Sequence, residues 1–284
     1  MSQLPNLIVI GAMKSGTTSI HDYLDQHPDI FMSKVKEIDF FIKEFHWDKG
    51  IAWYQAQFNT EAIVRGESSQ NYSKRHHFKS GVPNRIHNVI PNTRLIYLVR
   101  DPIDRIISHY HEALEGGYAP KEGLNQYLTG DLSNNHYVLT SSYYYQLQPY
   151  LEVFPLQNIL ICTLENLKLN RLSEMNRIFR FLRLSECSDD ALFDFVRNEG
   201  AQKRKKNVLG QFIESPSSQF FRRCLPRILK DRAKESSLSK KIMTSSVVRE
   251  SLNDSTFNSL VKALAPDMNR FRSLANESFS EWSV

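Results

Sequence analysis

The sequence has few cysteines and no long hydrophobic run. Only three cysteines occur in 284 residues, and their odd number and wide spacing argue against a disulfide framework and against a paired metal site. No apolar run approaches the roughly 18 residues that a membrane span requires. The first apolar run begins at Leu7, which leaves no room for a signal peptide. These absences predict a cytoplasmic protein.

Internal repeats, low-complexity tracts and recognised nucleic-acid-binding motifs are also absent. The 41% hydrophobic and 24% charged residues are typical of a globular domain with a substantial core. The net charge of +5 favours anionic partners. A phosphorylated ligand accounts for part of this charge, so no nucleic-acid partner is expected.

Short apolar runs alternate with helical patterns through residues 1–200, whereas the rest of the chain is serine- and charge-rich with helical periodicity. This order predicts an α/β fold with a central parallel sheet flanked by helices. We place a single P-loop-like α/β core at residues 1–210 and a helical C-terminal extension, packed on that core, at residues 211–284.

Residues 11–19 (GAMKSGTTS) follow the apolar residues 7–10 and predict a strand, a tight loop and a helix. Backbone N–H groups of such a loop and of the first helical turn favour a negative charge at one spot. A phosphate-bearing ligand is therefore expected here. The residues assigned to it are Lys14, Ser15, Gly16, Thr17, Thr18 and Ser19.

This loop lacks the Gly-Lys-Ser/Thr ending of the commonest nucleotide-binding loop, in which the hydroxyl binds magnesium. Gly16 is followed by Thr17, and the loop's lysine comes two positions before Gly16. No apolar run ends in an aspartate clearly suited to hold a metal. An ATP-dependent phosphotransferase is therefore only an alternative, and no metal is expected.

A second motif begins with the β-rich residues 94–99, after which Arg100, Asp101 and Pro102 lead into a helical pattern. Ser108 lies about two turns beyond Arg100 on a different face from the apolar residues of this helix. A guanidinium offers a planar fork of donors for phosphate, and a hydroxyl adds one neutral hydrogen bond. Arg100 and Ser108 are therefore candidates for a second phosphate.

A third candidate site is the sequence KEIDFF at residues 36–41, which places one carboxylate among cations and aromatic residues. Glu37 is the candidate general base, a role that requires reach and partial burial. Asp39 could do similar work. The structural alternative is that Glu37 only pairs with Lys34 or Lys36 on an exposed loop.

Together these motifs resemble sulfotransferases that use 3′-phosphoadenosine 5′-phosphosulfate (PAPS), and among them the heparan-sulfate and related carbohydrate enzymes. The resemblance implies that the KSGTT loop holds the 5′-phosphosulfate, and that Arg100 and Ser108 hold the 3′-phosphate. It also implies in-line transfer of a sulfuryl group to a hydroxyl or amine, with Glu37 as base and Lys14 neutralising charge on the leaving phosphate. The product is 3′-phosphoadenosine 5′-phosphate (PAP).

Residues 66–72 (GESSQNY) resemble the family's Gly-Glu-x-Ser/Thr-Pro-x-Tyr segment, which lines the cleft. Gln70 stands where proline is usual, and Ser68 stands where many heparan-sulfate enzymes have lysine, so the resemblance favours the fold more than that polymer. The acceptor is expected to be a carbohydrate, a glycoconjugate or a small molecule. The residues assigned to it are Lys36, Phe40, Glu67 and Tyr72.

The cationic residues 203–206 (KRKK) fall where the family closes a loop over the 3′-phosphate, and Arg204 is the candidate. A basic stretch at residues 220–234 predicts contact with an anionic membrane surface, or else a solvated helix face. A non-catalytic module for anionic glycans or lipids is the second alternative function. Because eukaryotic relatives work in the Golgi, a luminal domain without its anchor is the alternative to a cytoplasmic protein.

Overall fold

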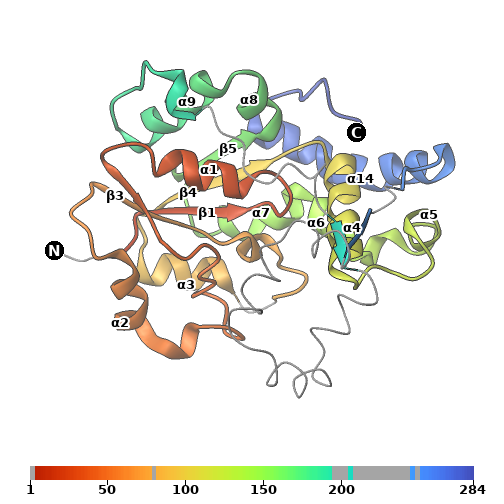
Figure 1. Ribbon diagram of the computed structural model, residues 1–284, viewed down its shortest axis with the longest axis horizontal. Helices are drawn as coiled ribbons and strands as arrows, with labels where there is room; N and C mark the ends of the chain where they lie inside the picture. The colour runs from red at the N-terminus through yellow and green to blue at the C-terminus, as the bar shows by residue number, and fades with distance from the viewer. Residues whose placement is uncertain (1–3, 79–80, 194–203, 207–243, 247–249) are drawn as a thin grey trace, which may run out of the picture.

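The computed structural model describes residues 4–78, 81–193, 204–206, 244–246 and 250–284, and Figure 1 shows their arrangement. The described strands are β1 (Leu7–Gly11), β2 (Ile30–Met32), β3 (Val64–Ser68), β4 (Arg94–Val99), β5 (Ile159–Thr163), β6 (Arg204–Lys206) and β7 (Thr244–Ser246). The described α-helices are α1 (Thr17–Leu24), α2 (Gly50–Gln55), α3 (Val82–Val89), α4 (Pro102–Gly116), α5 (Leu124–Tyr127), α6 (His136–Ser141), α7 (Tyr143–Leu151), α8 (Leu164–Leu169), α9 (Arg171–Leu182) and α14 (Asp254–Ala275). Short 3₁₀ helices include η1 (Trp47–Lys49), η2 (Ala56–Phe58), η3 (Gln70–Ser73), η4 (Leu132–Asn134), η5 (Leu156–Asn158) and η6 (Asp190–Phe193).

The main sheet has five strands in the order β2-β3-β1-β4-β5. Every pairing in it is parallel, which confirms the predicted α/β class. Strand β1 lies at the centre, with β3 on one side and β4 on the other. The chain changes direction across the sheet at β1, so the carboxyl ends of β1 and β4 form the crevice in which such sheets bind ligands.

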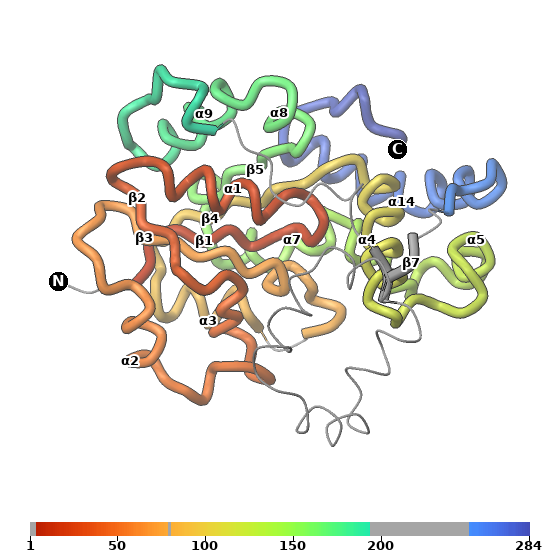
Figure 2. The backbone as a smooth tube through the Cα atoms, in the orientation of Figure 1, coloured from red at the N-terminus to blue at the C-terminus, as the bar shows by residue number. Residues whose placement is uncertain are grey.

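Alternate residues of β1 face two separate cores, as both faces of a buried parallel sheet require. Ile8 and Ile10 pack with residues from α3, α4, α7 and α14, whereas Leu7 and Val9 pack with residues from α1 and α9. The tube in Figure 2 traces α1 and α9 on one side of the sheet and α3 on the other. Loops, and not helices, cover the end of the sheet at which the strands terminate.

Helix α14 belongs to the packing of the sheet domain. Its residues Leu260, Leu264, Met268 and Phe271 are fully buried in the same core as β1 and β4. The boundary placed at residue 210 stays a prediction, because residues 207–243, including the basic stretch 220–234, lie outside the described residues.

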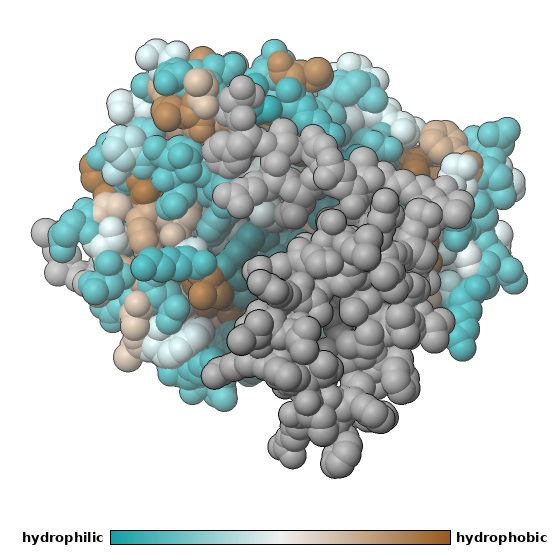
Figure 3. Space-filling model, viewed as in Figure 1, coloured by the Kyte–Doolittle hydropathy of each residue, from teal (hydrophilic) through white to brown (hydrophobic). Residues whose placement is uncertain are grey.

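The surface of the described residues is mainly hydrophilic on the face in Figure 3, where brown residues form small separate patches. None of the described helices is long and apolar enough to cross a bilayer. Cytoplasmic location and membrane contact stay predictions.

We predict that Leu264→Ala lowers the free energy of unfolding by about 2–5 kcal/mol, because it leaves a cavity in a fully buried site. Urea denaturation measures this change. Lys262→Ala, an exposed position on the same helix, is the control and should change stability by less than about 0.5 kcal/mol. Equal stabilities of the two variants would show that α14 is not part of the core.

Candidate active site

The loop after β1, residues 11–17, forms one wall of the candidate site and is called the phosphate loop below. It is held against the neighbouring strand by a hydrogen bond from the Ala12 N–H to the Leu98 carbonyl, at 2.6 Å. Gly11 has φ +147°, and a Cβ there would meet the Ser73 hydroxyl at 2.0 Å. Glycine is thus required at Gly11, because the chain after β3 passes directly beside it.

Helix α1 begins at this loop without a side-chain cap. Gly16, its N-cap, has φ 91°, and no side chain accepts a hydrogen bond from the first turn. The N–H groups of that turn therefore stay available to an anion. Ser15 adds a hydroxyl that is sealed from solvent and has no hydrogen-bond partner among the described residues.

Helix α4 supplies a stripe of polar side chains along the same crevice. It begins at Pro102, as predicted, and Asp101 caps it by accepting from the Asp104 N–H. Asp104, Ser108 and Glu112 are spaced four residues apart and so share one face. Arg100 pairs with Asp104 at 2.8 Å, and Lys14 pairs with Glu112 at 3.3 Å.

The two predicted phosphate-binding cations thus bind acidic residues on either side of Ser108. The Nε of Arg100 is buried and has no partner among the described residues, like the hydroxyl of Ser15. A ligand with phosphates at both ends requires hydrogen-bond donors and positive charge at two places. The crevice offers two donors without acceptors, two cations and the uncapped start of α1. The described part of the chain therefore fits PAPS.

The segment that carries Glu37 forms the opposite wall. The Glu37 N–H donates to the Ser68 carbonyl at 2.9 Å, so this segment runs beside the end of β3. Glu37 and Asp39 have positive φ values of 61° and 50°, and Lys14 has 68°. Such backbone strain costs on the order of 1 kcal/mol per residue and persists only where surrounding contacts hold it, often at functional sites.

Glu37 is accessible and ion-paired, whereas Asp39 is buried. The Glu37 side chain is 36% exposed and accepts a hydrogen bond from Lys36 at 2.7 Å. Asp39 accepts from Asn71 at 2.7 Å through one oxygen, while its other oxygen is buried without a partner. Burial raises the pKa of Asp39 to about 6. Both carboxylates thus remain candidate bases, and the predicted roles of the site residues stay predictions.

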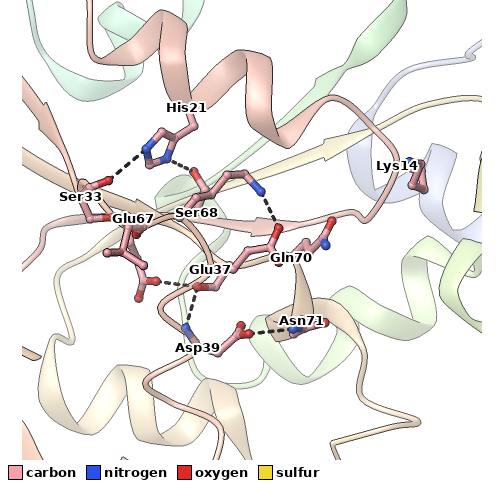
Figure 4. A network of polar contacts seen from close by, with 12 residues as sticks. Lys14, His21, Ser33, Glu37, Asp39, Glu67, Ser68, Gln70 and Asn71 are labelled. Atoms are coloured by element: carbon pink, nitrogen blue, oxygen red, sulfur yellow. Dashed lines mark hydrogen bonds and ion pairs between the residues drawn. The ribbon is translucent and has the colours of Figure 1, made fainter. Parts of the chain in front are cut away.

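Glu67 is a fully buried carboxyl beneath this wall. It receives hydrogen bonds from the hydroxyls of Tyr54 at 2.5 Å, Ser69 at 2.6 Å and Tyr72 at 3.0 Å. The Ser69 and Tyr72 oxygens also accept from the backbone N–H groups of Asp39 and Phe41. Glu67 therefore fixes the backbone on both sides of Phe40, and Figure 4 shows it beside Glu37 and Asp39, with Lys14 apart.

Three residues assigned to the acceptor are buried in this conformation. Phe40 and Glu67 are 0% exposed and Tyr72 is 2% exposed, and Phe40 stacks on Tyr54 with ring centroids 4.3 Å apart. They support the segment that carries Glu37, and their contact with an acceptor stays a prediction. Lys36 lies at the surface of this segment, half-buried beside Glu37.

Ser68, which stands where many heparan-sulfate enzymes have lysine, is buried and hydrogen-bonded to His21, with 2.9 Å between Ser68 Oγ and His21 Nδ1. Another lysine, Lys74, lies in the segment that follows β3. Lys74 is 9% exposed, and its ammonium donates to Asn71 at 2.7 Å. Burial, followed by the charge of Arg105, lowers the pKa of Lys74 to about 8. Lys74 had no recognisable motif in the sequence.

Arg204 lies in β6, which pairs antiparallel with β7 and lies beside α4. The backbone at residue 204 is thus near the helix that carries Ser108. The Arg204 side chain is outside the described structure, so its contact with the 3′-phosphate stays a prediction.

Comparison with known proteins identifies the family. The family model described as "Sulfotransferase domain" matches residues 4–242, and the chain belongs to this family. It is similar to heparan sulfate glucosamine 3-O-sulfotransferase 3B1 of Mus musculus, with 29% identity over 213 residues, which are 72% of this chain and 52% of that protein. For heparan sulfate glucosamine 3-O-sulfotransferase 5 of Homo sapiens the identity is 31% over 198 residues, 65% of this chain and 55% of that protein.

The chain spans about half the length of these curated relatives. Among solved structures, a sulfotransferase from Alicyclobacillus acidocaldarius has the same fold, with a TM-score of 0.66, 19% identity and 99% coverage of both chains. The resemblance to carbohydrate sulfotransferases and the α/β fold that it implied are therefore confirmed.

We predict that ionisation of Glu67 opposes folding. Burial raises its pKa from 4.5 to about 7, so the folded protein holds a proton that the unfolded chain has lost above pH 4.5. The stabilisation of wild type relative to Glu67→Gln should fall by about 1–3 kcal/mol between pH 5 and pH 8. Chemical denaturation at several pH values measures this difference.

Glu61→Gln, at an exposed position before the same strand, is measured alongside as the matched control. A difference for Glu67→Gln that stays constant or grows with pH would contradict the raised pKa.

Proposed function

We propose that this protein transfers a sulfuryl group from PAPS to a hydroxyl or amine of an acidic or neutral carbohydrate or glycoconjugate. The proposal is supported chiefly by the polar stripe on α4. Arg100 and Lys14 pair with the acidic residues on either side of Ser108 in this stripe. The relatives named as heparan sulfate glucosamine 3-O-sulfotransferases support a carbohydrate acceptor.

The phosphate loop binds the 5′ side of the donor through its N–H groups and the hydroxyls of Ser15, Thr17 and Thr18, with Ser19 in the same helical turn. Arg100 and Ser108 bind the 3′-phosphate. In this arrangement Asp104 and Glu112 orient Arg100 and Lys14 before the donor binds, since each holds one cation in the crevice. Arg204 is the further candidate for the 3′-phosphate, because the backbone of β6 lies beside α4.

When bound, PAPS supplies an activated sulfuryl group. Glu37 accepts the proton of the acceptor hydroxyl or amine as the acceptor's oxygen or nitrogen bonds to sulfur. Lys14 neutralises the negative charge that develops on the oxygen of the breaking sulfur–oxygen bond. The residues of the site supply both roles without a metal. The surrounding contacts that maintain the strained backbone at Lys14 and Glu37 hold the two groups in place for this task.

We predict that Arg100→Ala weakens PAP binding at least about tenfold, because a charge-assisted contact to phosphate is lost. Ser108→Ala should weaken it less, since it removes one neutral hydrogen bond. Calorimetric titration with PAP, without magnesium, measures both. Arg180→Ala, an exposed arginine on α9, is the control. Magnesium-dependent ATP binding in place of PAP binding would contradict the proposal.

We predict that Glu37→Gln lowers turnover at least about a hundredfold while PAP affinity stays within about twofold, because general base catalysis contributes roughly 10²–10⁴. The measurement is PAP release from PAPS in the presence of heparan-derived oligosaccharides. Glu44→Gln, exposed in the same segment, should retain wild-type turnover. If Asp39→Asn loses turnover and Glu37→Gln retains it, the base is Asp39.

A further inference from the structure

Four histidines gather beside the proposed site. The His136 ring, at the start of α6, lies 5.1 Å from the His76 ring, 5.3 Å from the His77 ring and 5.0 Å from the His109 ring, measured between centroids. His76 and His77 follow Lys74 in the chain, and His109 follows Ser108 on α4. The cluster thus touches the segment after β3 and the helix of the polar stripe.

Ligand nitrogens of His76, His77 and His136 lie within 4.8 Å of one another, which invites a metal ion. The hydrogen-bond network disfavours one. Gln146 accepts from the Arg75 N–H at 2.8 Å and donates to the Leu139 carbonyl at 2.7 Å, so the orientation of its amide is fixed.

The amide nitrogen of Gln146 also donates to His76 Nδ1 at 3.0 Å. His76 Nδ1 is therefore the acceptor, and the ring hydrogen sits on Nε2. This hydrogen is donated to His136 Nδ1 at 2.9 Å. A ring nitrogen that carries a hydrogen is not a metal ligand, so Gln146, His76 and His136 form a chain of hydrogen bonds.

His136 and His109 are left as hydrogen-bond donors through their Nε2 atoms. Since His136 Nδ1 accepts, its hydrogen is on Nε2. His109 Nδ1 lies 3.3 Å from a guanidinium nitrogen of Arg105, which can only donate, so the hydrogen of His109 is also on Nε2. Neither Nε2–H group has an acceptor among the described residues.

Two cations adjoin the histidine cluster, since Lys74 lies two residues before His76 and Arg105 donates to His109 Nδ1. The ammonium of Lys74 donates to Asn71, and its other hydrogens have no described acceptor. Arg105 is fully buried and donates to the Tyr137 carbonyl at 2.7 Å and the Ser141 hydroxyl at 2.5 Å, and no described carboxylate pairs with it. A buried positive charge without a counterion favours an anion nearby.

Burial and these charges keep His109 and His136 neutral. The pKa of His136 is lowered to about 4 by burial and then by Lys74. That of His109 is held well below its ordinary range by burial and then by Arg105, with further effects of Lys74 and Lys14. Lys74 in turn is influenced by the charges of Glu37, Asp39 and Glu112. Lys74, His109 and His136 thus share one electrostatic environment.

We propose that Lys74, His109 and His136 form a binding site for a sulfate-like oxyanion, with Arg105 behind it. The proposal rests on the proposed function for the source of the oxyanion, which is either the sulfuryl group of the donor or an acidic group of the acceptor. The site offers hydrogen-bond donors and positive charge without a paired carboxylate, which is the chemistry that sulfate requires.

The test is calorimetric titration of the PAP-saturated protein with sodium sulfate, at constant ionic strength. Lys74→Met should weaken sulfate binding at least about tenfold. His136→Phe keeps a ring but removes the donor, and should weaken it several-fold. His77→Phe, at the exposed neighbouring histidine, should leave it unchanged, and thermal melting verifies that each variant is folded.

The two sources of the oxyanion are distinguished by donor and acceptor measurements. If the site holds the sulfuryl group, Lys74→Met weakens binding of PAPS but not of PAP. If it holds a sulfate group of the acceptor, both affinities are retained and KM rises for heparan sulfate oligosaccharides but not for unsulfated heparosan oligosaccharides, whereas a rise for both polymers identifies a carboxylate of the acceptor. Either result supports the site.

Nitrogen-15 NMR of the histidine rings tests the premise independently of any ligand. His76, His109 and His136 should all carry hydrogen on Nε2. An Nδ1–H form of His136, or sulfate binding that is absent or unchanged in both variants, would overturn the proposal. If PAP does not bind, the proposed function fails, and sulfate titration of the ligand-free protein still tests the site.

Discussion

The central position of β1 in the parallel sheet is the constraint on which the rest of the molecule depends. Because β1 pairs with β3 and β4 at once, the loops after all three strands leave the same edge of the sheet. The first carries Lys14, the second runs beside Glu37 and leads to Lys74, and the third carries Arg100. Residues that are far apart in the sequence thereby surround one crevice.

Two buried contacts turn this proximity into a defined geometry. Gly11 lets the chain at Ser73 pass within van der Waals distance of the phosphate loop. Glu67, through the hydroxyls of Ser69 and Tyr72, holds the backbone on either side of Phe40. Three hydrogen bonds offset the unfavourable burial of the Glu67 carboxyl. The same network maintains the strained backbone from which Glu37 projects.

The sequence predicted the elements that local patterns specify. The strand, loop and helix at residues 7–24 and the helix start at Pro102 are both confirmed. The roles of Lys74 and Arg105 had no local signal, since their partners depend on how η3, α4 and α6 meet. Glu67 was recognised by its motif, but its depth follows from packing against Tyr54 and Tyr72, which a single sequence does not reveal.

The same limit applies to the histidines. His76 and His136 are 60 residues apart. The direction of their hydrogen bond is set by the Gln146 amide, whose orientation is fixed by hydrogen bonds to the Arg75 N–H and the Leu139 carbonyl.

We propose that the crevice between β1 and β4 binds the two phosphate ends of one nucleotide. A crystal structure of the protein with PAP tests it most directly. We expect the 5′-phosphate on the phosphate loop and the 3′-phosphate on Arg100 and Ser108, with the Arg100–Asp104 and Lys14–Glu112 pairs loosened. PAP bound elsewhere, or bound with its 3′-phosphate away from α4, would contradict it.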